Sequence, residues 1–520
     1  MMRGIFTVGF WTLASRIFGF ARDILIGAFL GAGPVAEAFL IAFALPNMFR
    51  RFFAEGAFNT AFVPMFSKKV EDGSDAEGFA QDAFSGLASI LIVLTLVAQL
   101  AMPWLVLAMA GGFAGDERFP LTVDYGRIAF VYILFISLAA LFSGMLNATG
   151  RFAAAAAAPV LLNIILVGVL LGVSWSVPDG KMTTLVDPAE AYGRALIWAV
   201  PVAGIAQMAL VWFAVYREGY RINLRLPRLT PDMRKLALIA LPAMLAGGVV
   251  QVNLLVGRFV ASYFEGAIAW LYYADRLYQL PLGVVGIAIG IVLLPDLSRR
   301  LRAGDDAGGR FAFSRAGELS MALTIPAAVA LAVISVPLVS VLFERGEFTS
   351  DDTAATALAL TVYAFGLPAF VLQKVLQPVY FAREDTRRPF HYALVAMFVN
   401  ALVAIGLSVF IGFLGAAIAT TAAAWVMVGL LSRGRRGLGD VAQFDDRFRT
   451  RIWRICAASV AMGIVLFASA LMLGPFFGEP GLRYVALALL VALGLVSYFG
   501  FARLFGAFNL RELRGTMRGH

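Results

Sequence analysis

Residues 84–110 have the sequence FSGLASILIVLTLVAQLAMPWLVLAMA, a continuous apolar stretch without a charged side chain. About 20 such residues in a helix cross the ~30 Å hydrocarbon core of a membrane. Similar stretches recur along almost the whole chain, in which 61% of the residues are hydrophobic and only 14% are charged. With a mean hydropathy of +0.83, this composition lies far from that of soluble globular proteins. The sequence therefore predicts an all-α, polytopic membrane protein.

The apolar stretches predict about fourteen transmembrane helices. They are placed at 5–30, 35–63, 84–110, 121–149, 157–175, 191–215, 234–262, 268–294, 317–341, 354–382, 389–410, 412–432, 453–474 and 482–506. The loops on one side hold most of the basic residues, for example those at 217–235, 299–310 and 433–451. Because cytoplasmic loops are enriched in Lys and Arg, both termini are expected in the cytoplasm. The net charge of +9 indicates contact with anionic lipid surfaces, not with nucleic acid.

The sequence offers little for catalysis. A single cysteine, Cys456, excludes a disulfide framework, and His391 and His520 do not combine with it at a usual metal-binding spacing. Neither a phosphate-binding G-x-x-x-x-G-K-[ST] loop nor an H-E-x-x-H motif occurs. We therefore expect a protein that is not an enzyme and that binds no metal or cofactor.

The chain resembles itself at an offset of roughly 231 to 236 residues. Arg22 aligns with Arg258, Leu45-Pro46 with Leu280-Pro281, and residues 63–69 with residues 294–300. Such repeats are typical of transporters. The repeat predicts an N-terminal lobe of six helices at 1–230, a second lobe of six at 231–435, and two appended helices with a tail at 436–520. The facing surfaces of two such lobes are expected to enclose a central substrate cavity.

Charged residues stand inside several of the predicted spans, where each costs on the order of 3 kcal/mol if it faces lipid. Seven are basic and four acidic, which leaves about three positive charges in excess. They are Arg16, Arg22, Asp23, Glu37, Arg50, Arg51, Glu55, Arg258, Asp275, Arg276 and Lys374.

Some of these charges have a structural alternative. Glu55 stands four residues after Arg51, a spacing that allows an ion pair on one helix face. Arg258 could instead reach the membrane interface with its long side chain. Arg16, Arg50 and Arg276 have no acid at i±4 in their own helix, which favours a water-filled cavity that holds an anion.

Arginine is suited to a phosphate-bearing ligand, because its planar guanidinium donates two parallel hydrogen bonds and stays ionised when partly desolvated. In the second predicted span, Pro46 is expected to break the helix at Asn47, just before Arg50 and Arg51. Such breaks are tolerated where the backbone lines a cavity. These residues together predict a cationic site for a pyrophosphate group.

Three segments carry a resemblance to a known family: SRIFGFARD at 15–23, LPNMFRRFFAEGAF at 45–58 and YYADRL at 272–277. In these segments, and in the number of helices, the chain resembles the MurJ (MviN) family of lipid II flippases, which belongs to the multidrug/oligosaccharidyl-lipid/polysaccharide exporter superfamily. The resemblance implies a bacterial inner-membrane protein that moves lipid II, an undecaprenyl-pyrophosphate-linked disaccharide-pentapeptide, between leaflets by alternating access. It implies contact with membrane lipids and with the cell-wall synthesis machinery.

The resemblance also implies roles for individual residues. Arg16, Arg22, Arg50 and Arg276 are expected to contact the pyrophosphate and sugar head group. Gate or supporting roles fall to Glu37, Asn47, Arg51, Glu55, Asp275 and Lys374. Two residues depart from the family pattern: Glu37 stands where Asp is frequent, and Gln279 stands where an acid is common, which puts a gate salt bridge at Gln279 in doubt.

Two questions stay open at this level. A cation-coupled exporter of drugs or of other polyprenyl-linked oligosaccharides, from the same superfamily, is the alternative function. Drug exporters need acidic residues for cationic drugs, whereas this cavity is expected to be net positive. Without an ATP site, the driving force is expected to be the membrane potential, a coupling ion, or removal of the product.

Overall fold

The computed structural model describes residues 2–51, 58–176 and 188–507, apart from the side chains of 2–5, 60, 242–254 and 284–292. The described chain is all-helical and contains no strand. It divides into two compact units, of which unit 1 contains residues 1–269 and 345–348, and unit 2 contains residues 270–344 and 349–520. The predicted lobes rest on the sequence repeat, a different criterion, and their bounds at 230 and 435 stay a prediction.

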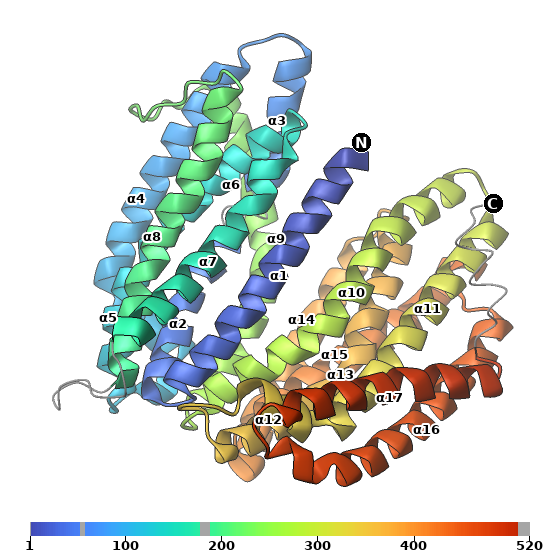
Figure 1. Ribbon diagram of the computed structural model, residues 1–520. Helices are drawn as coiled ribbons and strands as arrows, with labels where there is room; N and C mark the ends of the chain where they lie inside the picture. Colours follow the sequence, from blue (N-terminus) through green and yellow to red (C-terminus); the bar gives the residue numbers. More distant parts are fainter. Residues whose placement is uncertain (1, 52–57, 177–187, 508–520) are drawn as a thin grey trace. The chain divides into compact units, whose positions relative to one another are not determined.

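Unit 1 consists of helices that run up and down beside one another (Figure 1). They are α1 (Met2–Leu30), α2 (Pro34–Arg50), α3 (Asn59–Glu71), α4 (Ala76–Met109), the 3₁₀ turn η2 (Gly111–Phe113), α5 (Arg118–Phe130), α6 (Tyr132–Ala148), α7 (Phe152–Ser176), α8 (Pro188–Arg217) and α9 (Pro231–Ala261). Large buried aromatic residues, among them Phe39, Phe62 and Tyr132, fill its interior.

Unit 2 begins inside α10 (Ala267–Arg302). It continues through α11 (Asp306–Val333), α12 (Ser335–Phe343), α13 (Ser350–Phe381), α14 (Arg387–Ile411), α15 (Leu414–Gly434), the 3₁₀ turns η4 (Arg435–Leu438) and η5 (Asp440–Ala442), α16 (Asp446–Phe477) and α17 (Leu482–Leu504). The two C-terminal helices pack on α11 around Ile455, Met462 and Leu490. The Tyr498 hydroxyl of α17 donates to the Ala322 carbonyl of α11 at 2.6 Å.

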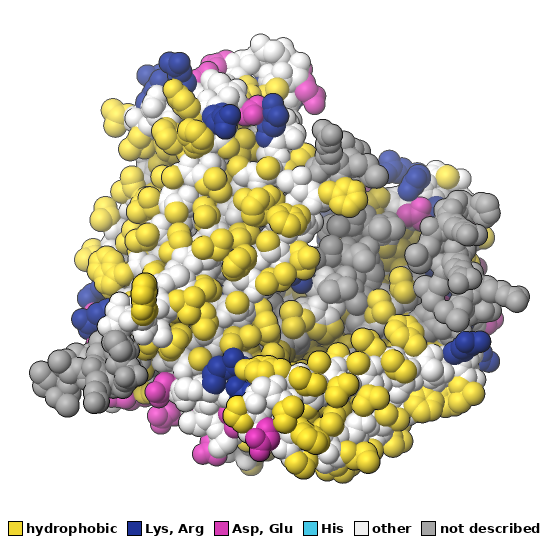
Figure 2. Space-filling view, viewed as in Figure 1, with side chains coloured by type: hydrophobic (Ala, Val, Ile, Leu, Met, Phe, Trp, Pro, Cys, Tyr) yellow, Lys and Arg dark blue, Asp and Glu magenta, His cyan; other side chains and the backbone are white. Residues whose placement is uncertain are grey.

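Ten helices in the described part of the chain are long and apolar enough to cross a membrane. Their surfaces agree with this, since α4 exposes Ile90, Leu100 and Trp104 by 59%, 78% and 69%. Figure 2 shows hydrophobic side chains over the middle of unit 1 and charged ones gathered toward the ends of its helices. The prediction of an all-α, multi-pass membrane protein is confirmed, while the count of fourteen spans stays a prediction.

Two predicted spans are divided in the structure. The span predicted at 317–341 changes direction at Ile334, between α11 and α12. Pro337 explains the break, because proline lacks the N–H that would continue the helix, whereas it is tolerated in the first turn of α12. The span predicted at 121–149 is divided at Val131, for which we have no physical account.

The predicted break at Pro46 is wrong. Helix α2 continues through Pro46 to Arg50 and widens into a π-helical turn at Arg51. The Asn47 side chain donates from Nδ2 to the Phe43 carbonyl at 2.8 Å. This hydrogen bond supports the helix one residue beyond the proline, where the ladder of backbone hydrogen bonds is weakened. A π-helical turn of this kind frequently marks a functional position.

Candidate functional site

Arg22 lies on α1 in a buried ion pair with its neighbour. The side chain is 7% exposed, and its Nε and Nη2 atoms donate to Asp23 Oδ1 at 3.0 and 2.6 Å. Its Nη1 atom donates to Asn163 Oδ1 of α7 at 2.8 Å, and the guanidinium lies 5.9 Å from the Phe43 ring of α2. Because Asp23 is only 2% exposed, each charge compensates the other in a site without solvent.

Asn163 was missed by sequence reasoning. It is 6% exposed, and its Nδ2 atom donates to the carbonyl of Ser15, the residue directly before Arg16, at 3.0 Å. Gly19 packs against this amide, since a Cβ there would lie 3.4 Å from Asn163 Nδ2, in van der Waals contact. An asparagine inside an apolar span was the available signal, because buried polar groups need partners. Asn163 thus fixes the part of α1 that carries the predicted binding residues.

Arg16 has a different environment from Arg22. Its side chain is exposed, six residues before Arg22, or about 9 Å along α1. Arg50 is half-buried at the end of α2, and Arg51 is exposed. Glu55 lies in 52–57, outside the described residues, so its proposed ion pair with Arg51 stays a prediction.

Glu37 lies fully buried in the first turn of α2. Its Oε2 atom accepts from Arg118 Nη1 of α5 at 2.9 Å, and its Oε1 atom accepts from the backbone N–H of Ile268 at 3.0 Å. Ile268 stands in the first turn of α10, where an anion is favoured by the helix dipole. The partner of Glu37 among the arginines is therefore Arg118, which sequence reasoning had assigned to a loop.

Arg118 extends this network to the α4–α5 connection. It donates from Nε to Asp116 Oδ2 at 2.7 Å, and its guanidinium lies 4.4 Å from the Phe113 ring. Burial alone would raise the pKa of the Asp116 carboxyl, but hydrogen bonds from Arg118 outweigh burial and hold that pKa below its usual range. Asp116, Arg118 and Glu37 thus form one chain of ion pairs from the exposed loop to the interior of unit 1.

A short piece of the α12–α13 loop completes the same end of unit 1. The Glu347 N–H donates to the Ala28 carbonyl near the end of α1 at 3.0 Å. Gly31 and Gly346 have φ of +62° and +58°, and a Cβ on either would lie 2.4 or 2.1 Å from a backbone oxygen. Glycine is therefore required twice for this close approach. Phe348, which follows, is 1% exposed.

The predicted residues of unit 2 lie on two helices. The Arg276 guanidinium of α10 is 4.5 Å from the ring of Tyr272, one turn earlier. The Gln279 amide donates to the Asp275 carboxylate. Gln279 thus gives Asp275 a hydrogen-bond partner on the same helix, and the gate role of this position stays a prediction. Lys374 is exposed on α13.

A second ionic cluster in unit 2 was missed by sequence reasoning. Glu318 of α11 pairs with Arg315 of the same helix and with Arg447 and Arg451 of α16. Arg315 also pairs with Asp445, whose side chain caps α16 by accepting from Phe448 N at 2.8 Å. The cluster attaches α16 to α11. Its signal was an acid at the edge of a span, but two of its arginine partners lie 129 and 133 residues away, a pairing that only the fold reveals.

Among the residues that the structure describes, no group of three or more His, Cys, Asp or Glu is placed to hold a metal ion. The chemistry that this arrangement offers is the binding of anions by arginine and the ordering of those arginines by buried acids.

Comparison with known proteins gives a consistent result. Residues 26–484 match the family model described as "Lipid II flippase MurJ". A probable lipid II flippase MurJ of Rhizobium meliloti is 44% identical over 519 residues, which cover 98% of this chain and 95% of that protein. The lipid II flippase MurJ of Burkholderia cenocepacia is 33% identical over 89% of each chain.

Solved structures show the same fold at lower sequence identity. A lipid II flippase MurJ in an inward closed conformation aligns with a TM-score of 0.79 at 23% identity, over 96% of this chain and 98% of that one. A multidrug resistance MATE family transporter in an inward-facing conformation aligns with a TM-score of 0.65 at 14% identity, over 82% of this chain and 95% of that one.

Proposed function

The chain belongs to the MurJ family of lipid II flippases, and from this premise we propose that it carries lipid II from the cytoplasmic to the periplasmic leaflet of the bacterial inner membrane. The observation that carries the proposal is the family match, which extends over nearly the whole chain. The transport is proposed to proceed by alternating access of the two lobes predicted from the repeat, with both termini in the cytoplasm.

We assign the pyrophosphate of the substrate to the arginines. Arg16 and Arg50 in unit 1 and Arg276 in unit 2 have exposed or half-buried side chains, and guanidinium groups bind phosphate oxygens strongly. Arg22 has a supporting part in this proposal, because Asp23 and Asn163 already hold it in place. Glu37, Asn47, Arg51, Glu55, Asp275 and Lys374 are proposed to support or gate the site.

The alternative of a drug exporter receives no support of its own. The likeness to a MATE transporter, at 14% identity, concerns the fold alone. The excess of arginine in α1 and α2 opposes the binding of a cationic drug, since like charges repel in a site of low polarity.

Genetic complementation tests the proposal. The chain is expressed in a strain whose own lipid II flippase is depleted, and growth and cell shape are followed. We expect rescue by the native chain and none by the Arg16→Ala variant at equal membrane levels. Absence of rescue by the native chain, despite normal membrane insertion, would contradict the assignment.

A further inference from the structure

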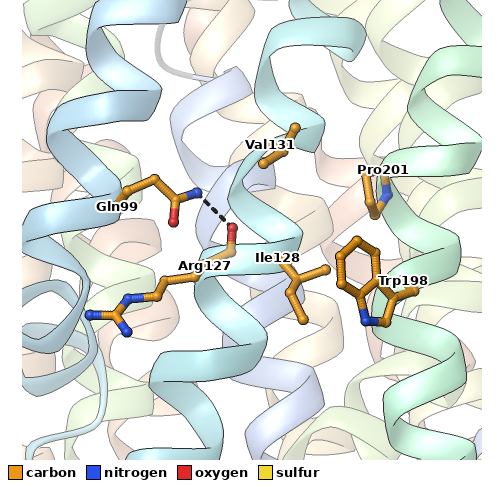
Figure 3. Close-up of a pocket in the computed structure, with 6 residues that line it drawn as sticks. All are labelled: Gln99, Arg127, Ile128, Val131, Trp198 and Pro201. Atoms are coloured by element: carbon orange, nitrogen blue, oxygen red, sulfur yellow. Dashed lines mark hydrogen bonds between the residues drawn. The ribbon is translucent and has the colours of Figure 1, made fainter.

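A small apolar groove opens on the flank of unit 1 between α4, α5 and α8 (Figure 3). Its volume is about 260 Å³, and it is lined by Gln99, Arg127, Ile128, Val131, Trp198 and Pro201. This volume is below the roughly 300–1,000 Å³ of pockets that enclose a whole small molecule. The groove therefore suits part of a long chain, not a complete ligand.

The α5 side of the groove changes from charged to apolar along one helix face. Asp124, Arg127, Ile128 and Val131 have the spacing i, i+3, i+4 and i+7, which places them in one stripe. Asp124 and Arg127 are both exposed, although they belong to a segment apolar enough to cross a membrane. In the described part of the chain, neither side chain takes part in an ion pair within 4 Å.

The position of the stripe matches the edge of a membrane. Helices α5 and α6 together form a span of 31 residues, from Arg118 to Ala148, with a length of about 46 Å against about 30 Å of hydrocarbon. Arg127 lies nine residues, or about 14 Å, from the Arg118 end, so its guanidinium can reach the head-group level. Trp198, 58% exposed on α8, is a residue type enriched at that level.

Figure 3 shows how the groove is built. The Trp198 indole lies beside Ile128, while the Arg127 side chain extends to the opposite side, toward α4. The Gln99 amide donates to the Arg127 carbonyl at 2.7 Å and so joins α4 to α5. This hydrogen bond fixes the backbone of α5 against α4 beside the groove.

We propose that this groove binds one phosphatidylethanolamine molecule of the surrounding leaflet. Arg127 binds the lipid phosphate, Asp124 binds the ammonium, and an acyl chain lies along Ile128 and Val131 against Trp198. Asp124 lies three residues, or about 4.5 Å, nearer than Arg127 to the Arg118 end of α5. In this lipid the ammonium likewise lies farther than the phosphate from the hydrocarbon core. An anionic head group would meet Asp124 unfavourably, and a choline head group lacks N–H donors for a carboxylate.

Native mass spectrometry of the full-length protein in detergent tests the proposal. The protein is titrated with phosphatidylethanolamine, phosphatidylglycerol and phosphatidylcholine that have the same acyl chains. We expect phosphatidylethanolamine to bind about 5-fold or more tightly than the other two, the size of effect that one or two partly exposed charged contacts give. Equal binding of all three lipids, or a preference for phosphatidylglycerol, would overturn the proposal.

Variants separate the three parts of the site. Arg127→Gln should lower retention of phosphatidylethanolamine by about 5-fold or more, and Asp124→Asn should remove its advantage over phosphatidylglycerol. Val131→Trp fills the groove without changing a charge and should also lower retention. Arg151→Gln is the control. Arg151 is an exposed cation that follows α6, at the end away from the groove, and pairs with Glu218. A loss of retention in the control equal to that in Arg127→Gln would refute a specific site.

Discussion

At the scale of single residues, the charges of this protein divide into buried and accessible sets. Arg22 and Glu37 are among the buried charges, and each has a partner on another helix. Arg16 and Lys374 are exposed. The sequence predicts which residues carry charge inside spans, because a charge in an apolar run is visible. It does not predict their partners, since Asn163 and Arg118 lie 141 and 81 residues away.

The buried pair of Glu37 and Arg118 gives the first prediction. Glu37→Gln keeps the shape but leaves Arg118 without one of its two carboxylates, so it should destabilise the protein by about 2–4 kcal/mol. Glu37→Asp keeps the charge and should cost less and impair flipping less. Thermal unfolding in detergent and a flipping assay measure both effects. Glu190→Gln, which breaks the exposed pair with Arg194, is the control, and a shift as large as that of Glu37→Gln would contradict our interpretation.

The arginines give the second prediction. Arg16→Ala, Arg50→Ala and Arg276→Ala should abolish flipping while folded protein remains in the membrane. Arg22→Ala should also lower the amount of folded protein, because it leaves Asp23 charged in a buried site. The double variant Arg22→Ala/Asp23→Ala should recover folded protein but not flipping. Western blots of membranes, together with growth of the depleted strain, distinguish these outcomes, and growth supported by all three single variants would rule out the anion site.

At the scale of elements, residues 28–37, where α1 ends and α2 begins, accept hydrogen bonds from two segments that are distant in the sequence. The α12–α13 loop reaches it through Glu347, and the start of α10 reaches it through Ile268. Most helices could be predicted from apolar length, as α4 and α7 demonstrate. The continuity of α2 through Pro46 could not, because a proline inside a helix removes a backbone hydrogen bond and the supporting bond from Asn47 to Phe43 is visible only in the structure. The close approach at Gly31 could not either, because it joins segments more than 300 residues apart.

Gly346 gives a prediction at this scale. Gly346→Ala should lower the thermal unfolding temperature, because its positive φ costs about 1 kcal/mol and the added Cβ would meet the Ala28 carbonyl oxygen. Gly73→Ala is a matched control, with a φ of +64° but nothing within 4 Å. The difference between the two variants isolates the contact with α1. Equal unfolding temperatures would show that this contact adds nothing.

At the scale of the whole molecule, the source of energy is the open question. A pyrophosphate carries roughly two negative charges, and each charge that crosses the field gains about 2.3 kcal/mol per 100 mV. An inside-negative potential therefore favours the outward passage of the substrate. It also favours the inward return of a carrier whose arginines have lost their counter-ion.

The fourth prediction concerns the driving force for flipping. We expect the membrane potential alone to drive flipping by the purified protein in liposomes, without a sodium or proton gradient. A potassium diffusion potential, set in either direction, provides the test, with lipid II accessibility on the outer leaflet as the measurement. If reversing the potential changes neither rate nor extent, a coupling ion must supply the energy.

The division of the chain into two units also affects when unit 1 can finish folding during synthesis. Residues 345–348 belong to unit 1, yet the ribosome makes them about 80 residues after the rest of that unit. At about 5–20 residues per second, the delay is about 4–16 s. During it, the Ala28 carbonyl lacks the Glu347 N–H, and the place of Phe348 stands empty. Unit 1 therefore cannot finish folding until residues 345–348 have been synthesised, well into the second half of the chain.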